Sequence, residues 1–134
     1  MNTDIKAKNR NILVTGAASG IGAALCLRLA RPGTRLFLHT RANRAGAEAV
    51  GEAVAAAGGE SEILLGDLAD APVADALIAA VAEHGNLDAL IANAGFADKT
   101  PLADLDDAVL ARSLAAMPGA FHRLCRAAMP LVQA

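Results

Sequence analysis

Short apolar runs alternate with longer stretches of helical periodicity along most of the chain. Residues 12–14 are all apolar, which is typical of a strand buried on both faces of a parallel sheet. From residue 20 to 30 apolar positions recur at three- and four-residue steps, and the Arg-Pro-Gly sequence after them predicts the end of a helix. The same reasoning predicts strands at 35–39, 63–65 and 87–92, and helices at 45–57 and from 73 to near 85.

The last helical stretch, at about 103–129, has Pro118 and Gly119 in its middle. Because proline lacks an amide hydrogen and clashes with the preceding turn, we predict one helix that bends near Met117. Strands that alternate with helices at this spacing indicate an α/β fold, a doubly wound, Rossmann-like parallel sheet with helices on both faces. No repeat, low-complexity tract or linker divides the sequence, so we predict a single domain over residues 1–134.

Composition narrows the classes of function. A content of 54% apolar residues with a net charge of −2 predicts a compact core rather than disorder. The near-neutral charge and the 2% aromatic content disfavour nucleic-acid binding. The sequence shows neither the pattern of a signal peptide nor the apolar length of a membrane helix, and we expect a cytoplasmic protein.

The cysteines and histidines show no spacing typical of a metal site or a catalytic triad. Cys26 and Cys125 lie in apolar helical patterns, so we expect buried reduced thiols without a chemical role. His39, His84 and His122 are far apart in the sequence, and we expect each to be a solvated or capping side chain. The sequence therefore predicts no metal site.

Three glycines follow the first predicted strand and open the first predicted helix. The sequence TGAASGIG at 15–22 lies where a doubly wound fold presents backbone amides and a positive helix end to a phosphate. Its spacing is not G-x-G-x-x-G, and no lysine follows at the position that a triphosphate-binding P-loop requires. The turn favours a dinucleotide over a triphosphate, with a tight strand-to-helix connection that binds nothing as the alternative.

Together with two later motifs, this turn resembles the short-chain dehydrogenase/reductase family. The three motifs are Thr15-Gly16-x-x-x-Gly20-x-Gly22, Asp67 just after the third predicted strand, and Asn93-Ala94-Gly95 at the end of the fourth. The resemblance covers essentially the whole chain and implies an NAD(P)-dependent oxidoreductase. It implies that the turn holds the pyrophosphate, the aspartate contacts the adenine, and the Asn-Ala-Gly segment stabilises the sheet beside the cofactor. The implied cofactor-binding residues are Gly16, Ser19, Gly20, Ile21, Gly22, Asp67, Leu68, Asn93, Ala94 and Gly95.

Asp67 also has a physical reason to bind a ligand. A carboxylate at the carboxyl-terminal edge of a sheet can accept a hydrogen bond from an exocyclic amine. The alternative is a helix N-cap, but Asp70, which precedes Pro72, is better placed for that role. We therefore expect Asp67 to be free for a ligand.

The end of the second predicted strand bears on the choice of coenzyme. An NAD enzyme usually carries an acidic residue there to hold the ribose 2′-hydroxyl, and in this register the position is Thr40. Arg41 follows at once and Arg44 soon after, and a guanidinium suits a 2′-phosphate better than a diol. We predict NADP rather than NAD, with a solvated loop charge as the alternative for Arg41.

The residues of hydride transfer are not found in the sequence. The resemblance implies a catalytic Ser, Tyr and Lys, assisted by an Asn in the bent helix. The chain has no tyrosine, and Ala116 stands at the position of the Asn. We therefore expect no catalytic residues and no activity from this chain alone.

The predicted order of the strands, 3-2-1-4, leaves the apolar fourth strand as an exposed edge of a truncated sheet. We expect weak binding through the ADP portion of the cofactor, and a homo-oligomer formed through this edge or the last helix. The preferred hypothesis is the cofactor-binding part of an NADP-dependent short-chain reductase. The alternative is a non-catalytic nucleotide-binding or oligomerisation module, while a flavodoxin-like or receiver domain is disfavoured because the first strand ends in Thr-Gly rather than an acidic pocket.

Overall fold

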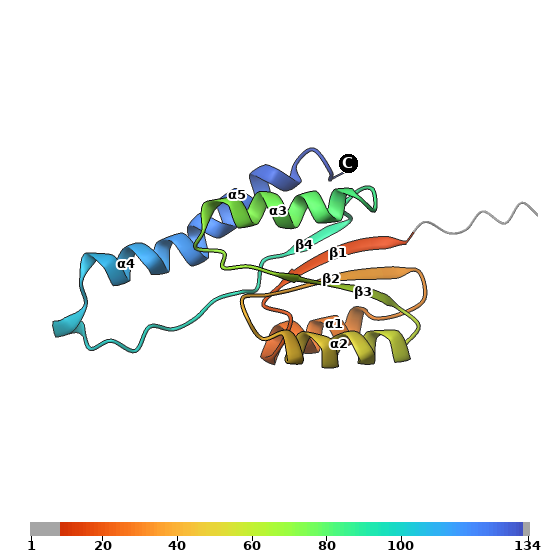
Figure 1. The fold of residues 1–134 in the computed structure, drawn as a ribbon, viewed down its shortest axis with the longest axis horizontal. Helices are drawn as coiled ribbons and strands as arrows, with labels where there is room; N and C mark the ends of the chain where they lie inside the picture. Colours follow the sequence, from red (N-terminus) through yellow and green to blue (C-terminus); the bar gives the residue numbers. More distant parts are fainter. Residues whose placement is uncertain (1–8, 133–134) are drawn as a thin grey trace, which may run out of the picture.

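A parallel sheet with helices on both faces forms the centre of the computed structural model, which describes residues 9–132 (Figure 1). The strands are β1 (Arg10–Thr15), β2 (Thr34–Thr40), β3 (Glu60–Leu65) and β4 (Ala89–Ile91). The helices are α1 (Gly20–Leu29), α2 (Arg44–Ala56), α3 (Ala71–Ala82), α4 (Asp107–Leu114) and α5 (Ala120–Ala128), with a π-helical turn η2 (Ala115–Gly119) between the last two.

The order of the strands is β3-β2-β1-β4, and every pair is parallel. The predicted doubly wound fold and the 3-2-1-4 order are therefore confirmed. β4 forms an edge of the sheet, as expected, and a single parallel bridge joins Leu87, just before it, to Val132.

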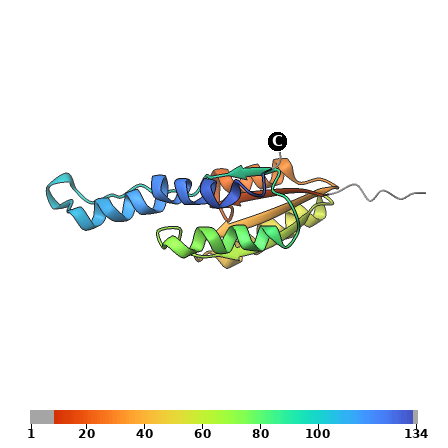
Figure 2. The ribbon, with the colours of Figure 1, turned by 90° about the horizontal axis from the view of Figure 1, so that it is seen from above.

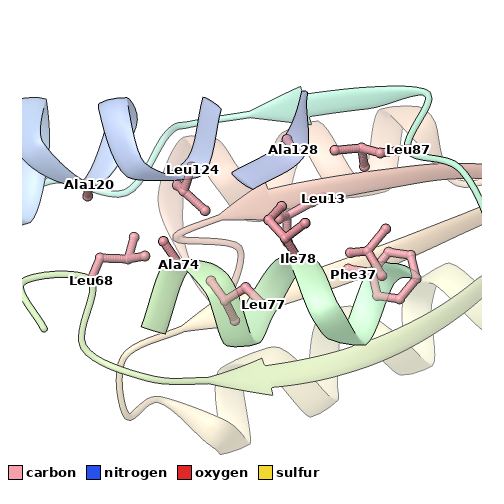
Figure 3. Packing of buried hydrophobic residues seen from close by; sticks show 11 residues of the cluster. Leu13, Phe37, Leu68, Ala74, Leu77, Ile78, Leu87, Ala120, Leu124 and Ala128 are labelled. Carbon is pink, nitrogen blue, oxygen red and sulfur yellow. The ribbon is translucent and has the colours of Figure 1, made fainter. Parts of the chain in front are cut away.

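The side chains of each central strand pack alternately into two apolar layers. Leu13 and Phe37 face α3 and α5, where they pack with Leu77 and Leu124 (Figure 3). The neighbours of Leu13 and Phe37 along β1 and β2 face the opposite layer, formed with α1 and α2. Because both faces are covered, β1 and β2 read as continuous apolar runs, which is why the sequence reveals them. The opposite-face group is Ile12, Val14, Leu36 and Leu38.

The two outer strands differ most from their predicted bounds. β3 begins at Glu60, three residues earlier than expected, because its first residues are polar and exposed and so carry no apolar signal. β4 covers only Ala89–Ile91, since its register with β1 spans three residues. The length of an edge strand depends on how many of its residues pair with the neighbouring strand. A short apolar run in the sequence does not indicate that number.

The last helix is irregular where proline predicts it, as a π-helical turn. Pro118 lies within η2, and helical structure continues on both sides of it. The helix begins at Asp107 rather than near residue 103, since the carboxylate of Asp106 accepts a hydrogen bond from the Val109 amide at 2.9 Å and caps the first turn. α4 extends beyond the end of the sheet in both views (Figures 1 and 2).

Across residues 9–132, no helix combines the length and the apolar character needed to cross a membrane.

Candidate functional site

The connection from β1 into the first turn of α1 requires glycine at three positions. Gly16 has a φ of +68° and Gly20 a φ of +54°, both in the left-handed region that side chains disfavour. A Cβ at Gly22 would lie 2.0 Å from the carbonyl oxygen of Gly16, so the first turn of α1 lies directly against the glycine turn. Only glycine at residue 22 permits this approach.

The segment after β4 is bonded to this turn. The Asn93 side-chain amide donates to the carbonyl oxygens of Thr15 and Gly16, at 3.1 and 3.3 Å. In return, the Thr15 hydroxyl oxygen accepts hydrogen bonds from the backbone amides of Asn93 and Ala94, at 3.1 and 3.0 Å. These four bonds hold the glycine turn at a set distance from the end of β4.

His39, at the end of β2, holds the same turn from the other side. Its Nδ1 accepts a hydrogen bond from the Gly16 amide at 3.4 Å, and its Nε2 donates to the Gly66 carbonyl at 2.9 Å. These partners assign the neutral tautomer with hydrogen on Nε2. His39 is only 2% exposed, so the expectation of a solvated or capping histidine is wrong here. A polar residue inside a strand buried on both faces was the signal available in the sequence.

Burial lowers the pKa of His39 from its usual 6.5, and this effect exceeds the opposing influence of the bond to Gly66 and the Asp67 carboxylate. The neutral form is therefore favoured, which agrees with the acceptor role of Nδ1. His122 is exposed and His84 is paired with Glu62 at 2.9 Å on the surface, in line with the expectation for these two.

A cleft of about 420 Å³ opens at the carboxyl ends of the strands, beside the glycine turn. Its lining combines predicted cofactor-binding residues with residues outside that prediction. The predicted residues that line the cleft are Gly16, Arg41, Asp67, Leu68, Ala94 and Gly95. The additional ones are His39, Phe96 and Arg112, together with Ala116.

The remaining predicted residues lie near this cleft but outside its lining. Asn93 lines an adjoining cavity of about 460 Å³ that shares Leu68, Ala94, Gly95 and Ala116 with the cleft. Four residues at the start of α1 line neither space: Ser19, Gly20, Ile21 and Gly22. Ile21 is 73% exposed, which leaves an apolar side chain in solvent at the amino end of α1.

Asp67 is engaged rather than free. One carboxylate oxygen accepts a hydrogen bond from the Ala69 amide at 2.9 Å, and the other accepts from Arg112 at 3.1 Å. The bond from Ala69 is the main cause of a lowered pKa at Asp67, with Arg112 and Arg41 acting in the same direction. Asp70 lies at the N-cap of α3, as expected, although its side chain makes no capping hydrogen bond. Each Asp67 oxygen retains a second acceptor position.

Arg123 connects the loop after β3 to the π-helical turn η2. Its Nη2 donates to the Leu68 carbonyl at 2.7 Å and to the Ala115 carbonyl at 2.9 Å. Ala115 is the first residue of the π-helical turn that contains Pro118, so Arg123 joins this turn to the loop after β3. This arrangement fixes two parts of the cleft wall, at Leu68 and beside Ala116.

The remaining candidates lie outside the cleft. Arg44 is exposed on α2, where it pairs with Glu48 at 3.9 Å. Cys26 is buried, which raises the pKa of its thiol to about 11, whereas Cys125 is half-buried. Within the described part of the chain, no group of three or more His, Cys, Asp or Glu side chains could hold a metal ion.

Comparison with known proteins identifies the fold. Residues 10–134 match the family model of the short chain dehydrogenases. The chain belongs to the short-chain dehydrogenase/reductase family. It is 33% identical over 127 residues to a 3-oxoacyl-[acyl-carrier-protein] reductase, FabG, of Aggregatibacter actinomycetemcomitans, and the match covers 93% of this chain and 52% of that protein. Among the curated relatives that it matches, the chain spans about half of their length or less, from 35% to 52%.

Solved structures of this family share the fold and carry either form of the coenzyme. A 3-oxoacyl (acyl-carrier-protein) reductase of Agrobacterium tumefaciens with NADP bound has a TM-score of 0.82 at 32% identity, over 92% of this chain and 48% of that one. An NADH-dependent reductase, A1-R′, complexed with NAD has a TM-score of 0.83 at 28% identity, over 94% of this chain and 53% of that one.

Proposed function

We propose that residues 1–134 form one partial dinucleotide-binding domain, the NADP-binding portion of a short-chain dehydrogenase/reductase-type oxidoreductase. The observation that carries this proposal is the position of the glycine turn. Its backbone at Gly16 borders a cleft that also contains Arg41 and Asp67. In a doubly wound fold this edge of the sheet, at the amino end of the first helix, is where a pyrophosphate is favoured.

The residues of the cleft suit such a ligand. The close approach of α1 at Gly22 keeps the turn tight. Arg41 and Arg112 contribute two positive charges against the single carboxylate of Asp67, and this excess favours a phosphorylated ligand. The free acceptor positions of Asp67 could receive an exocyclic amine of adenine beside the apolar side chain of Leu68.

We propose NADP over NAD because of two residues at the carboxyl end of β2. Thr40 is buried and not acidic, so it offers no carboxylate to a ribose diol. Arg41 is exposed and lines the cleft, where a guanidinium can bind a 2′-phosphate. Relatives bound to NADP and to NAD are both known in the family, so the support for this choice comes from Arg41.

We propose that residues 1–134 by themselves catalyse no hydride transfer. The sequence contains no tyrosine to act as the family's acid or base. Ala116 lines the cleft at the position where the resemblance implies an assisting asparagine, and its methyl group cannot donate a hydrogen bond.

A non-catalytic module for nucleotide binding or self-association is the second candidate. It is supported by apolar side chains about half exposed along α4 and α5, at Leu110, Leu114 and Phe121, and by the edge position of β4. A homo-oligomer through one of these surfaces is therefore part of the proposal. A cytoplasmic location stays a prediction from the sequence.

The decisive experiment is calorimetric titration of the chain with NADP, NAD and ADP, combined with light scattering to measure its mass. Binding of all three, with NADP tightest, supports the cofactor-binding role. A tight symmetric assembly that binds no nucleotide would favour the second candidate. Incubation with NADPH and carbonyl compounds should show no oxidation of the coenzyme.

A further inference from the structure

We propose that His39 is a positioning residue for the glycine turn: its neutral ring accepts the hydrogen of the Gly16 amide and so holds the turn in the conformation that binds pyrophosphate, and protonation of Nδ1 breaks this bond. This inference rests on the proposed function, because it assigns a pH response to the same nucleotide site. It concerns a residue that contacts the turn rather than one that reacts.

The geometry places His39 between two parts of the cleft. Its ring accepts from the Gly16 amide at 3.4 Å and donates to the Gly66 carbonyl at 2.9 Å, while its backbone carbonyl accepts from the Ala17 amide at 2.8 Å. Two successive amides of the turn, at Gly16 and Ala17, therefore depend on one residue of β2. The ring also borders the cleft itself.

Protonation would reverse the role of Nδ1. The imidazolium carries hydrogen on both nitrogens, so Nδ1 would present a donor to the Gly16 amide, which is also a donor. The ring is buried and cannot turn into solvent, and its other nitrogen is held by Gly66. The turn must then move away from the ring, or the ring from the turn.

Three charged groups border the cleft beside His39. Asp67, in the loop after β3, raises the pKa of His39 and so favours protonation. Arg41 at the end of β2 and Arg112 on α4 also line the cleft, and positive charges beside the ring oppose protonation. Burial also opposes it and is the largest influence on the pKa of His39. The switch should consequently operate below the usual pKa of histidine.

The first test uses the unaltered chain without nucleotide. Long-range ¹⁵N–¹H correlation spectra report the tautomer of each histidine, and a pH titration follows the Gly16 amide at the same time. We expect His39 in the Nε2–H form, and a Gly16 amide shift whose midpoint coincides with the His39 titration, with the exposed His122 as internal comparison. An Nδ1–H tautomer, or a Gly16 amide that ignores the His39 titration, would overturn the proposal.

The second test measures ADP-ribose affinity by calorimetry from about pH 5 to pH 8. ADP-ribose is chosen because its pyrophosphate keeps its charge over this range, unlike the 2′-phosphate of NADP, whose second pKa is about 6. We expect affinity to fall about three- to tenfold on acidification, the fold-change of one neutral hydrogen bond. The matched control His122→Asn should show the same fall.

Two substitutions separate the bonds of the ring. Asn at residue 39 places an oxygen near the position of Nδ1 and does not titrate, so His39→Asn should show affinity that is independent of pH. Gln instead places its amide near Nε2, so His39→Gln should bind about three- to tenfold more weakly than His39→Asn at pH 8. Equal affinities of the two variants, or tighter binding of the unaltered chain in acid through attraction to an imidazolium, would overturn the proposal.

The two hypotheses fail in different ways. If the unaltered chain binds no ADP-ribose at pH 8, the proposed function fails, while the coupling between His39 and Gly16 is still decided by the spectra. If binding occurs without the pH response, only the role of His39 fails.

Discussion

Arg112 on α4 donates a hydrogen bond to the carboxylate of Asp67 at 3.1 Å, which joins the helix after β4 to the loop after β3 across the cleft. The two residues are 45 positions apart in the sequence. This hydrogen bond limits the acceptor positions of the Asp67 carboxylate that remain for a ligand, because the other carboxylate oxygen already accepts a hydrogen bond from the Ala69 amide.

Substitution of Arg112 tests what the pair does to Asp67. In Arg112→Gln the pKa of Asp67 should rise toward its usual value while staying below it, since the bond from Ala69 persists. Carbon-detected titration of the carboxyl group measures this directly. Because the pair is partly exposed, the free energy of unfolding should change by no more than about 1 kcal/mol.

The exposed Arg126 on α5 provides the matched control, since Arg126→Gln removes the same charge outside the cleft lining. An Asp67 pKa that is equally unaffected by both substitutions would show that Arg112 does not act on this carboxylate in solution.

Arg41 is the residue on which the choice of coenzyme depends. Arg41→Asp should weaken NADP binding about tenfold or more, because a charged hydrogen bond to the 2′-phosphate is replaced by repulsion. NAD binding should change little or improve. The affinity ratio of the two coenzymes, measured by calorimetry, reports the effect.

Arg44→Asp is the control for this experiment, because Arg44 lies three residues away, is exposed and does not line the cleft. A ratio that is unchanged in Arg41→Asp, or changed equally in both variants, would contradict the role of Arg41.

Gly22 should tolerate no side chain. A Cβ there would lie 2.0 Å from the Gly16 carbonyl oxygen, so in Gly22→Ala the first turn of α1 must move away from the glycine turn. We expect the free energy of unfolding to fall by about 1–3 kcal/mol, as for other overpacked sites, with loss of nucleotide binding. Urea denaturation and calorimetry measure the two effects.

Gly51 offers a comparison within α2. A Cβ at Gly51 would meet only the Ser61 hydroxyl, at 3.1 Å, and a methyl group of Leu38, at 3.8 Å. Because alanine is the better helix former, Gly51→Ala should leave stability unchanged or raise it by up to about 1 kcal/mol. Equal stability of the two variants would show that the backbone contact at Gly22 is not tight.

The lowered pKa of His39 also makes stability depend on pH. The unfolded chain binds a proton near pH 6.5, whereas the folded chain binds it only at lower pH, so acidification favours the unfolded state within this window. The contribution of His39 to the free energy of unfolding is fully present above about pH 6.5. It decreases as the pH falls toward the pKa of His39 in the folded chain. Urea denaturation at a series of pH values should show this decrease, and His39→Asn should lessen it. The opposite slope would mean that the folded protein favours the imidazolium.

The sequence by itself determined the class of the fold and the position of the glycine turn. Strands β1 and β2 are covered on both faces, so their apolar runs are unbroken, and Pro118 marks the π-helical turn because it lacks an amide hydrogen. Thr15, Gly16 and Asn93 were visible as motifs because each lies at or directly after the end of a strand. Each of these signals depends only on residues that are close together in the sequence, so it can be recognised without the structure.

Only the tertiary structure decided which side chains share the cleft and how each is engaged. Arg112 contacts Asp67, and Arg123 contacts Leu68 and Ala115, because the last helical stretch packs against the loop after β3. His39 carries no motif, and its role follows from the parallel register that aligns Thr15 with His39 and so brings the ring to the Gly16 amide. Such contacts depend on the closure of long loops, so the spacing of residues along the chain does not specify them.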